Sequence, residues 1–240
     1  MDDVAAWFLA LYKTTGIKLT IFYDGYDRAR FFQGFVTTVK LSAYCLVLSL
    51  VLGALAAWLT GSRVAVVRRA VTGFVALFRN TPPLVQLYFF YFALGPLVPK
   101  VDGAPLLGSF GWAVVSLTLL ETAFAAEIYR AGIEAIHKGQ MEAALTLGMT
   151  PARAMQYIIL PQAVRTMLPP MTTFAITLLK DTALVSVVAA PEIMFYARNL
   201  VTESFLSMHV YLIAALIYLS MTIPMARIAA ALERSKRRWQ

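Results

Sequence analysis

The hydrophobic positions of this 240-residue chain gather into long, nearly charge-free stretches that are separated by shorter polar connectors. A helix needs about 20 mostly apolar residues to cross roughly 30 Å of hydrocarbon. Stretches of this kind predict five transmembrane helices, over residues 33–59, 70–96, 112–129, 166–189 and 209–231. The expected fold class is therefore an all-α membrane protein with its two ends on opposite sides of the bilayer.

The first 32 residues follow a different pattern, because aromatic side chains such as Trp7, Phe8 and Tyr12 are interleaved with charged ones. This segment has no charge-free run long enough to span a bilayer, and Trp and Tyr are favoured at the membrane–water interface. We expect residues 1–32 to form a periplasmic interfacial segment, and residues 33–240 to form the transmembrane domain.

Composition agrees with a membrane protein, since 60% of the residues are hydrophobic and the mean hydropathy is +0.69. A formal charge of +8 would suit a nucleic-acid-binding protein, but the Lys and Arg residues are spread over the connectors instead of forming one patch. If the N-terminus lies outside, the inner connectors hold 12 Lys and Arg residues and the outer ones hold six. The positive-inside rule then predicts N-terminus out and C-terminus in.

The longest inner connector, about residues 130–165, is too polar to span and has a helix-forming composition. Gly148 suits a helix C-cap, Thr150 an N-cap and Pro151 the first position of a helix. The pattern predicts two short helices at a sharp angle, one over 133–147 and one ending near Pro161. Loops of this length are usually functional, and this shape is suited to docking a partner.

Charged residues within the spans are candidates for a substrate path. Arg79 and Glu121 both lie near the middle of the bilayer, where a charge costs about 2.5–3.5 kcal/mol on insertion scales. They either surround an amphipathic substrate or pair with each other. Lys180 and Asp181 are adjacent and point to different faces of a helix, so they suit a role in the path, a dimer contact or solvation of a helix end.

Two prolines predict a break in the second span. Pro82 and Pro83 remove two backbone donors, and Thr81 could cap the half-helix that follows. The N-terminus of a half-helix at the midplane is a favourable site for a carboxylate, because its free N–H groups and dipole attract an anion. The alternative is a packing kink that contacts no ligand.

Several function classes find no support in the sequence. The chain has no G-x-x-x-x-G-K-[ST] sequence, so we expect no ATP hydrolysis by this chain. The spans carry no Ser/His/Asp set and no pair of metal ligands, so we expect no catalytic residue, cofactor or metal. An ion-coupled secondary transporter or a channel subunit remains an alternative, although such proteins commonly contain internal repeats, which are not found here.

A spaced motif occupies the long inner connector. Its residues follow the spacing E-A-A-x3-G-x9-I-x-L-P and are Glu142, Ala143, Ala144, Gly148, Ile158, Leu160 and Pro161. This pattern resembles the EAA loop of ABC importer permeases at every fixed position. The resemblance implies a coupling helix that seats in a cleft of a cytoplasmic ATPase subunit, which would bind the ATP and Mg.

Other segments are similar to the polar amino acid permeases of the histidine/glutamine/arginine/opine family. They are 79–87 (RNTPPLVQL), 127–130 (EIYR) and 179–185 (LKDTALV), the last with Ala183 where the family has Ser. The resemblance implies a permease subunit of the bacterial inner membrane that translocates polar amino acids delivered by a periplasmic binding protein. It also implies a second permease subunit, either identical or paralogous.

Two positions depart from the family pattern. Pro83 stands where relatives more often have Leu, and Glu121 stands where they usually have a small polar or aromatic residue. A carboxylate in a low-dielectric cavity attracts a cation more strongly than it does in water. Glu121 therefore favours a cationic amino acid such as arginine, lysine, ornithine or an opine as the substrate.

Overall fold

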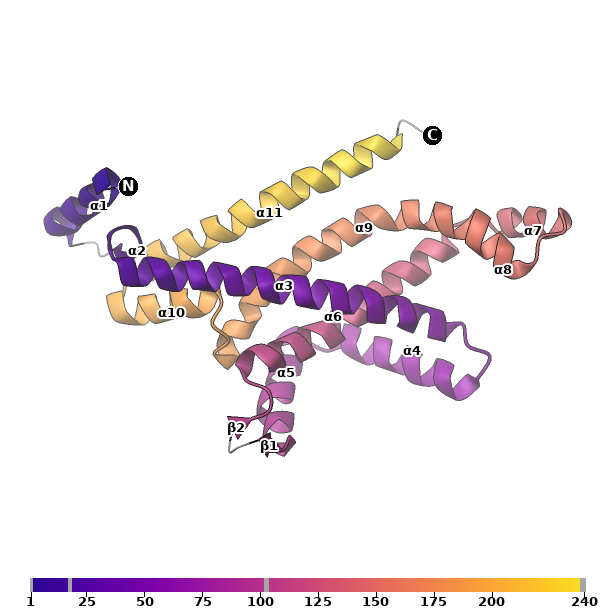
Figure 1. Ribbon diagram of the computed structural model, residues 1–240, viewed down its shortest axis with the longest axis horizontal. Coiled ribbons are helices and arrows are strands. Elements are labelled where there is room, and N and C mark those ends of the chain that lie inside the picture. The colour runs from indigo at the N-terminus through magenta and orange to yellow at the C-terminus, as the bar shows by residue number, and fades with distance from the viewer. Residues whose placement is uncertain (1, 17–18, 102–103, 238–240) are drawn as a thin grey trace. The chain divides into compact units, whose positions relative to one another are not determined.

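The computed structural model describes residues 2–16, 19–101 and 104–237, so Lys18 and Arg238 of the charge count lie outside the described residues. Almost all of the described chain is helical (Figure 1). The helices are α1 (Asp2–Thr15), α2 (Thr20–Tyr23), α3 (Gly25–Thr60), α4 (Ala65–Asn80), α5 (Pro83–Tyr88), α6 (Ser109–Glu134), α7 (Lys138–Thr146), α8 (Pro151–Ala154), α9 (Leu160–Asp181), α10 (Ile193–Ser204) and α11 (Ser207–Arg237).

Shorter elements connect these helices. Phe89–Leu94 and Met155–Ile159 are π-helical, and Gly95–Leu97 and Thr182–Val188 are 3₁₀-helical. Strands β1 (Lys100–Val101) and β2 (Ala104–Pro105) form a small antiparallel ladder.

The predicted spans correspond to helices, with one interruption. Within the residues that the structure describes, four helical stretches are long and apolar enough to cross a membrane: Gly25–Thr60, Ser109–Glu134, Pro151–Val188 and Ser207–Ala231. The second predicted span is divided into α4 and the shorter apolar stretch Pro83–Leu97. The division falls at Thr81, which is extended (φ −108°, ψ 141°). The predicted break at the two prolines is therefore confirmed.

Two helix boundaries differ from the sequence-based expectation. Helix α3 begins at Gly25, eight residues before the predicted span, and the Asp24 carboxylate accepts a hydrogen bond from the N–H of Tyr26 (2.8 Å) as an N-cap does. The single helix predicted over 133–147 is wrong, because α6 continues to Glu134 and α7 begins afresh at Lys138. Nδ1 of His137 caps the new helix by accepting from the N–H of Gly139 (3.1 Å).

The second helix of the long connector also differs from expectation. It does not end near Pro161 but continues from α8 through Met155–Ile159 into α9 as one membrane-length helix, Pro151–Val188. Pro161 has no N–H to offer the carbonyl four residues earlier, and its ring crowds that carbonyl. The wider π-helical turn directly before it relieves this conflict without ending the helix.

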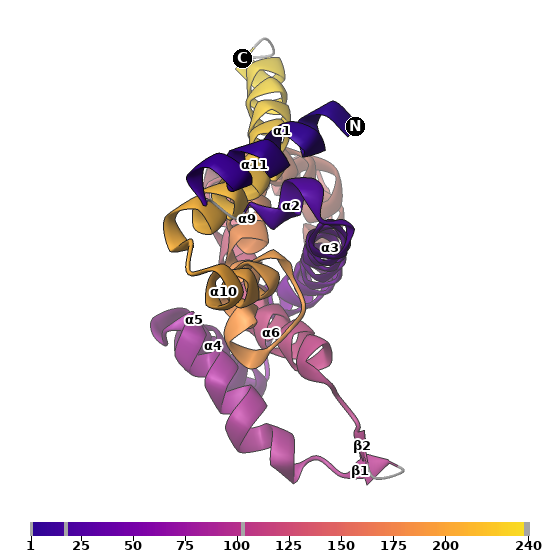
Figure 2. The same cartoon turned by 90° about the vertical axis from the view of Figure 1, so that its left-hand side faces the viewer.

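One compact unit of the chain comprises Met1–Tyr44, Pro83–Leu117 and Leu178–Ile223. In this unit α10 packs beside the first part of α3 and the first part of α11 (Figure 2). The shared apolar core includes Phe31 from α3, Ile193 and Leu200 from α10, and Val210 and Ala214 from α11.

The other compact unit comprises Cys45–Pro82, Thr118–Thr177 and Pro224–Gln240. Its core is built from small side chains on three helices, including Ala56 of α3, Val75 of α4 and Ala123 of α6. A Cβ added at Gly53 would lie 2.6 Å from the Cβ of Ala125, so α3 and α6 approach closely only because residue 53 is glycine. Small residues of this kind allow close helix packing within a membrane.

Candidate functional site

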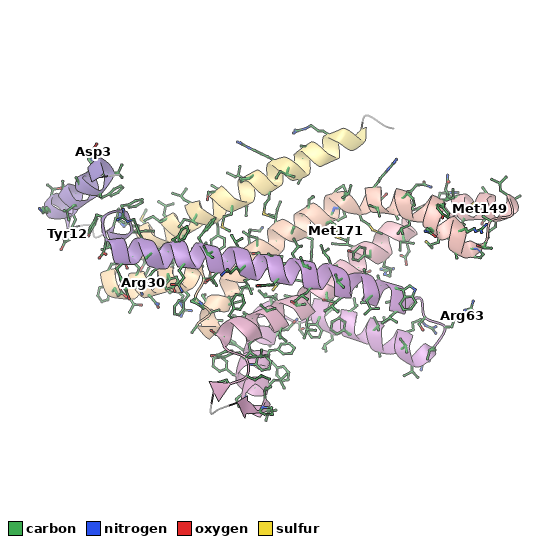
Figure 3. The ribbon with its side chains drawn as sticks, in the orientation of Figure 1. Asp3, Tyr12, Arg30, Arg63, Met149 and Met171 are labelled. Carbon is green, nitrogen blue, oxygen red and sulfur yellow. The ribbon has the colours of Figure 1, made fainter. Side chains whose placement is uncertain are left out.

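The turn between α7 and α8 is built by local backbone chemistry. Gly148 has a φ of +82°, which glycine adopts at little cost. Its N–H donates to the carbonyl of Leu145 (3.0 Å), and the N–H of Met149 donates to the carbonyl of Ala144 (3.1 Å). These two bonds form a Schellman motif, so the predicted C-cap role of Gly148 is confirmed. Met149, labelled in Figure 3, lies at this turn.

The next helix starts as the sequence predicted. The hydroxyl of Thr150 accepts a hydrogen bond from the N–H of Arg153 (3.4 Å), and Pro151 is the first residue of α8. Helix α7 packs against α8 and the π-helical segment 155–159. The amide of Gln162 also donates to the side-chain oxygen of Gln140 (3.5 Å). These contacts hold the two sides of the turn together.

The residues of the E-A-A motif differ in their burial. Ala144 is buried, whereas Glu142, Ala143, Gly148 and the following Leu160 and Pro161 are exposed, and Ile158 is half-buried. The apolar side chain of Leu147, which precedes Gly148, is 84% exposed. Exposed apolar groups rimmed by polar residues are typical of a protein–protein contact surface. The turn therefore presents a protruding surface that combines apolar and acidic groups.

The last turns of α6 carry a chain of ion pairs, one of which joins α6 to α4. The Arg79 guanidinium lies 3.0 Å from the Glu127 carboxylate and stacks over Phe124 at 5.8 Å from the ring centre. Glu127 also pairs with Arg130, which pairs in turn with Glu134 at 2.6 Å. The recorded partner of Arg79 is thus Glu127, not the Glu121 that the sequence reasoning considered. The E-I-Y-R segment contained this signal, because Glu127 and Arg130 lie one turn apart.

Glu121 lies on a polar stripe of α6. Its side chain is 2% exposed, and Thr118 and Thr122, one turn before and one residue after it, are buried as well. Among the described residues, the Thr122 hydroxyl has no hydrogen-bond partner. Buried polar atoms without a partner are rare in folded proteins.

The other predicted path residues lie elsewhere. The hydroxyl of Thr81, expected to cap the helix after Pro82, donates to the carbonyl of Leu77 at the end of α4 (2.8 Å). Lys180 is exposed and Asp181 is half-buried at the end of α9. These last two residues belong to the compact unit that does not contain Arg79 and Glu121.

Glu192, which was not among the residues predicted for a site, is fully buried directly before α10. Its carboxylate accepts hydrogen bonds from the N–H groups of Met194 (2.8 Å) and Phe195 (2.7 Å) and from the hydroxyl of Tyr218 (2.7 Å). Burial raises the pKa of Glu192 to about 7, although these hydrogen bonds oppose the shift. A glutamate directly before a helical run is an N-cap signal, but the bond to Tyr218 has no sequence signature.

Comparison with known proteins gives a consistent result. Residues 49–238 match the family described as the binding-protein-dependent transport system inner membrane component. The chain is 34% identical over 210 residues to GlnM of Bacillus subtilis (strain 168), a probable glutamine ABC transporter permease protein. That match covers 88% of this chain and 94% of GlnM. This chain is also 36% identical over 193 residues to ArtQ, the arginine ABC transporter permease protein of Haemophilus influenzae. That match covers 80% of this chain and 86% of ArtQ.

Solved structures agree in fold. An amino acid ABC transporter crystallised with histidines superposes with a TM-score of 0.80 at 31% identity, covering 87% of this chain and 94% of that one. The MetNI methionine ABC transporter, at 20% identity and a TM-score of 0.66, shares the fold. The chain therefore belongs to the family of binding-protein-dependent transport system inner membrane components, as a multi-pass permease subunit of amino acid ABC importers.

Proposed function

We propose that this chain lines the path of an amino acid importer and that its α7–α8 turn receives the motion of a cytoplasmic ATPase subunit. The observation that carries this proposal is the Schellman turn at Gly148, which presents Glu142 and Leu147 at an exposed, fixed corner. An exposed leucine anchor beside an acidic group fits a mixed apolar and basic cleft on a partner. The ATP and Mg are bound by that partner, and this chain has no catalytic role.

The assembly that follows has two permease subunits, two ATPase subunits and a periplasmic binding protein. Each permease subunit crosses the membrane five times, with its N-terminus outside and its C-terminus inside. The divided second span, α4 followed by Pro83–Leu97, counts as one of these crossings, and the distribution of Lys and Arg supports the orientation.

The substrate assigned to this path is a cationic amino acid. Arg79 pairs with Glu127. Glu121 is buried on α6, and the hydroxyl of the next residue, Thr122, has no hydrogen-bond partner within the described part of the chain, so this stretch of α6 carries oxygen acceptors suited to an ammonium or guanidinium group. Among the relatives, ArtQ is named for arginine and GlnM for glutamine, so both classes of side chain belong in the test.

Cross-linking tests the docking surface. In a Cys45→Ser background, Leu147→Cys should cross-link to the purified ATPase subunit, because Leu147 protrudes from the turn. Arg63→Cys is the matched control, since Arg63 is exposed in the other inner connector, between α3 and α4 (Figure 3). Equal cross-linking of both positions, or none at Leu147, would show that this turn is not the docking surface.

A conservative substitution tests the substrate assignment. Glu121→Gln should lower arginine uptake by about tenfold or more, because a charge-assisted hydrogen bond contributes roughly 1.5–3 kcal/mol. Assembly and basal ATP hydrolysis should persist, and Glu121→Asp should retain part of the uptake. Unchanged uptake of arginine and lysine in an assembled Glu121→Gln complex would exclude the cationic assignment.

A further inference from the structure

A cavity of about 560 Å³ opens within the second compact unit, where the end of α3, the first turns of α4 and the last turns of α6 meet. Its volume is in the range of sites that hold small molecules. Helix α4 contributes Arg68, Thr72 and Val75, whose spacing of four and three residues places them on one face. The cavity is therefore a feature of the helix packing and not of a single loop.

The cavity has an apolar wall and a polar rim. Val75 of α4 and Ala126 of α6 are buried core residues and form part of the wall, together with Ala57 of α3. Thr60 and Thr72 contribute hydroxyl groups. An amphipathic ligand with a polar head and a hydrocarbon tail matches this division.

The cavity is lined by Arg68 and Arg130 and by two glutamates, and Arg79, which lies outside the lining, adds a third arginine through its pair with Glu127. The two lining carboxylates, Glu127 and Glu134, are both paired with arginine. Arg68 also lines the cavity, and its Nη1 donates a hydrogen bond to the backbone carbonyl of Ser62 (2.9 Å). A guanidinium has five N–H donors in a fork that fits a phosphate. The guanidinium of Arg68 therefore retains donors for an anionic head group.

The cavity lies beside residues that are typical of the membrane–water interface. Trp58 lies in the last turn of α3 and is 75% exposed, as expected of the tryptophans that mark the membrane–water interface. Thr60, two residues further on, lines the cavity. The connector that follows carries Arg63, and Arg68 lies in the first turn of α4; basic pockets between membrane helices bind anionic head groups.

We propose that this cavity is a binding site for an anionic phospholipid, with the lipid phosphate on Arg68 and the first part of an acyl chain against Ala57 and Val75. The site is independent of the amino acid substrate and of ATPase docking. It makes the packing of α3, α4 and α6 dependent on the lipid composition of the membrane.

The test is the binding of dioleoyl phosphatidylglycerol to the purified full-length chain, measured by native mass spectrometry. Arg68→Gln should weaken binding of one lipid by about 10- to 100-fold, the effect of losing a charge-assisted hydrogen bond. Arg69→Gln is the matched control, because it removes the same charge from the neighbouring residue, which does not line the cavity. The control should bind within about twofold of the wild type, as expected for an exposed charge.

A second variant separates a cavity site from surface attraction. Thr72→Trp fills the cavity without changing any charge and should also weaken lipid binding, while the melting temperature shows whether the variant is folded. Gly73→Ala, which adds a methyl group to open space on the same helix, should bind normally. Equal losses in Arg68→Gln and Arg69→Gln, or wild-type binding by a folded Thr72→Trp variant, would overturn the proposal. Displacement of the lipid by equimolar glycerol phosphate would likewise show a site for a soluble phosphate.

Discussion

The carboxylate of Glu127 lies between two guanidiniums, because it pairs with Arg79 of α4 at 3.0 Å and with Arg130 of its own helix. The two cations share one anion and would repel each other without it. Glu127 should therefore contribute more to the stability of the protein than either arginine does.

The asymmetry predicts unequal effects of neutralisation. Glu127→Gln removes the anion that the two half-exposed guanidiniums share, and we expect it to destabilise the protein by about 1 kcal/mol or less. Arg79→Gln should cost less, because Glu127 keeps Arg130 as a partner. Melting temperatures of the purified variants in nanodiscs would measure these losses of stability. The double variant, with both Glu127→Gln and Arg79→Gln, completes a double-mutant cycle. Equal and additive losses from the two single changes would contradict the shared pair.

The turn at Gly148 predicts a loss of coupling without a loss of insertion. A side chain at φ +82° costs about 1–2 kcal/mol, although a Cβ at residue 148 would meet open space. Gly148→Arg should therefore tilt α7 and abolish substrate-stimulated ATP hydrolysis in an assembled complex. Gly148→Asn should keep much of the stimulation, because Asn tolerates the left-handed conformation. If Gly148→Arg retains wild-type stimulation, the turn is not the coupling element.

Buried Glu192 predicts a dependence of stability on pH. Its pKa is about 7 in the folded protein and near 4.5 when exposed, so the neutral carboxyl is favoured by folding. Its contribution is complete below about pH 4.5 and is lost as the pH rises through about 7, a change on the order of 1–3 kcal/mol.

Melting temperatures at pH 5 and pH 8 test this prediction. The wild type should melt at a lower temperature at pH 8 than at pH 5, and Glu192→Gln should remove most of that difference. Tyr218→Phe, which deletes the hydroxyl that donates to Glu192, is a useful companion variant. A Glu192→Gln protein with the full wild-type pH dependence would assign the titration to another group.

The orientation predicts which cysteines are accessible from the periplasm. In a Cys45→Ser background, a cysteine at Gln140, exposed in α7, should resist a membrane-impermeant reagent in intact cells. A cysteine at Leu106, which is exposed after β2 at the other end of α6, should react. Reaction at residue 140 and protection at residue 106 would reverse the proposed topology.

Local features of the fold were predictable from sequence. The Gly148 C-cap, the Thr150 N-cap and the break at Pro82 each depend on a few neighbouring residues. Glycine tolerates a positive φ, the threonine hydroxyl accepts a backbone hydrogen bond, and proline has no N–H to donate. The continuation of the helix through Pro161 was not predictable in this way. A proline ordinarily ends a helix, and here a π-helical turn accommodates it.

The side-chain pairing of the site was harder to predict. Depth in the membrane suggested Glu121 as the partner of Arg79, but Glu127 lies on the same helix and only the packing of α4 on α6 selects between them. The bond between Glu192 and Tyr218 joins the N-cap of α10 to a residue of α11 that lies 26 positions further along the chain. Sequence spacing within one helix carries no information about such contacts.

The most direct test of the central claim is amino acid uptake into proteoliposomes that contain this chain with its ATPase partner, supplied with the periplasmic binding protein. We expect labelled arginine to accumulate only when ATP is present on the ATPase side and the binding protein on the other. We also expect Gly148→Arg to abolish this accumulation while the complex stays assembled. Accumulation driven by an ion gradient in the absence of ATP and of the binding protein would contradict the account.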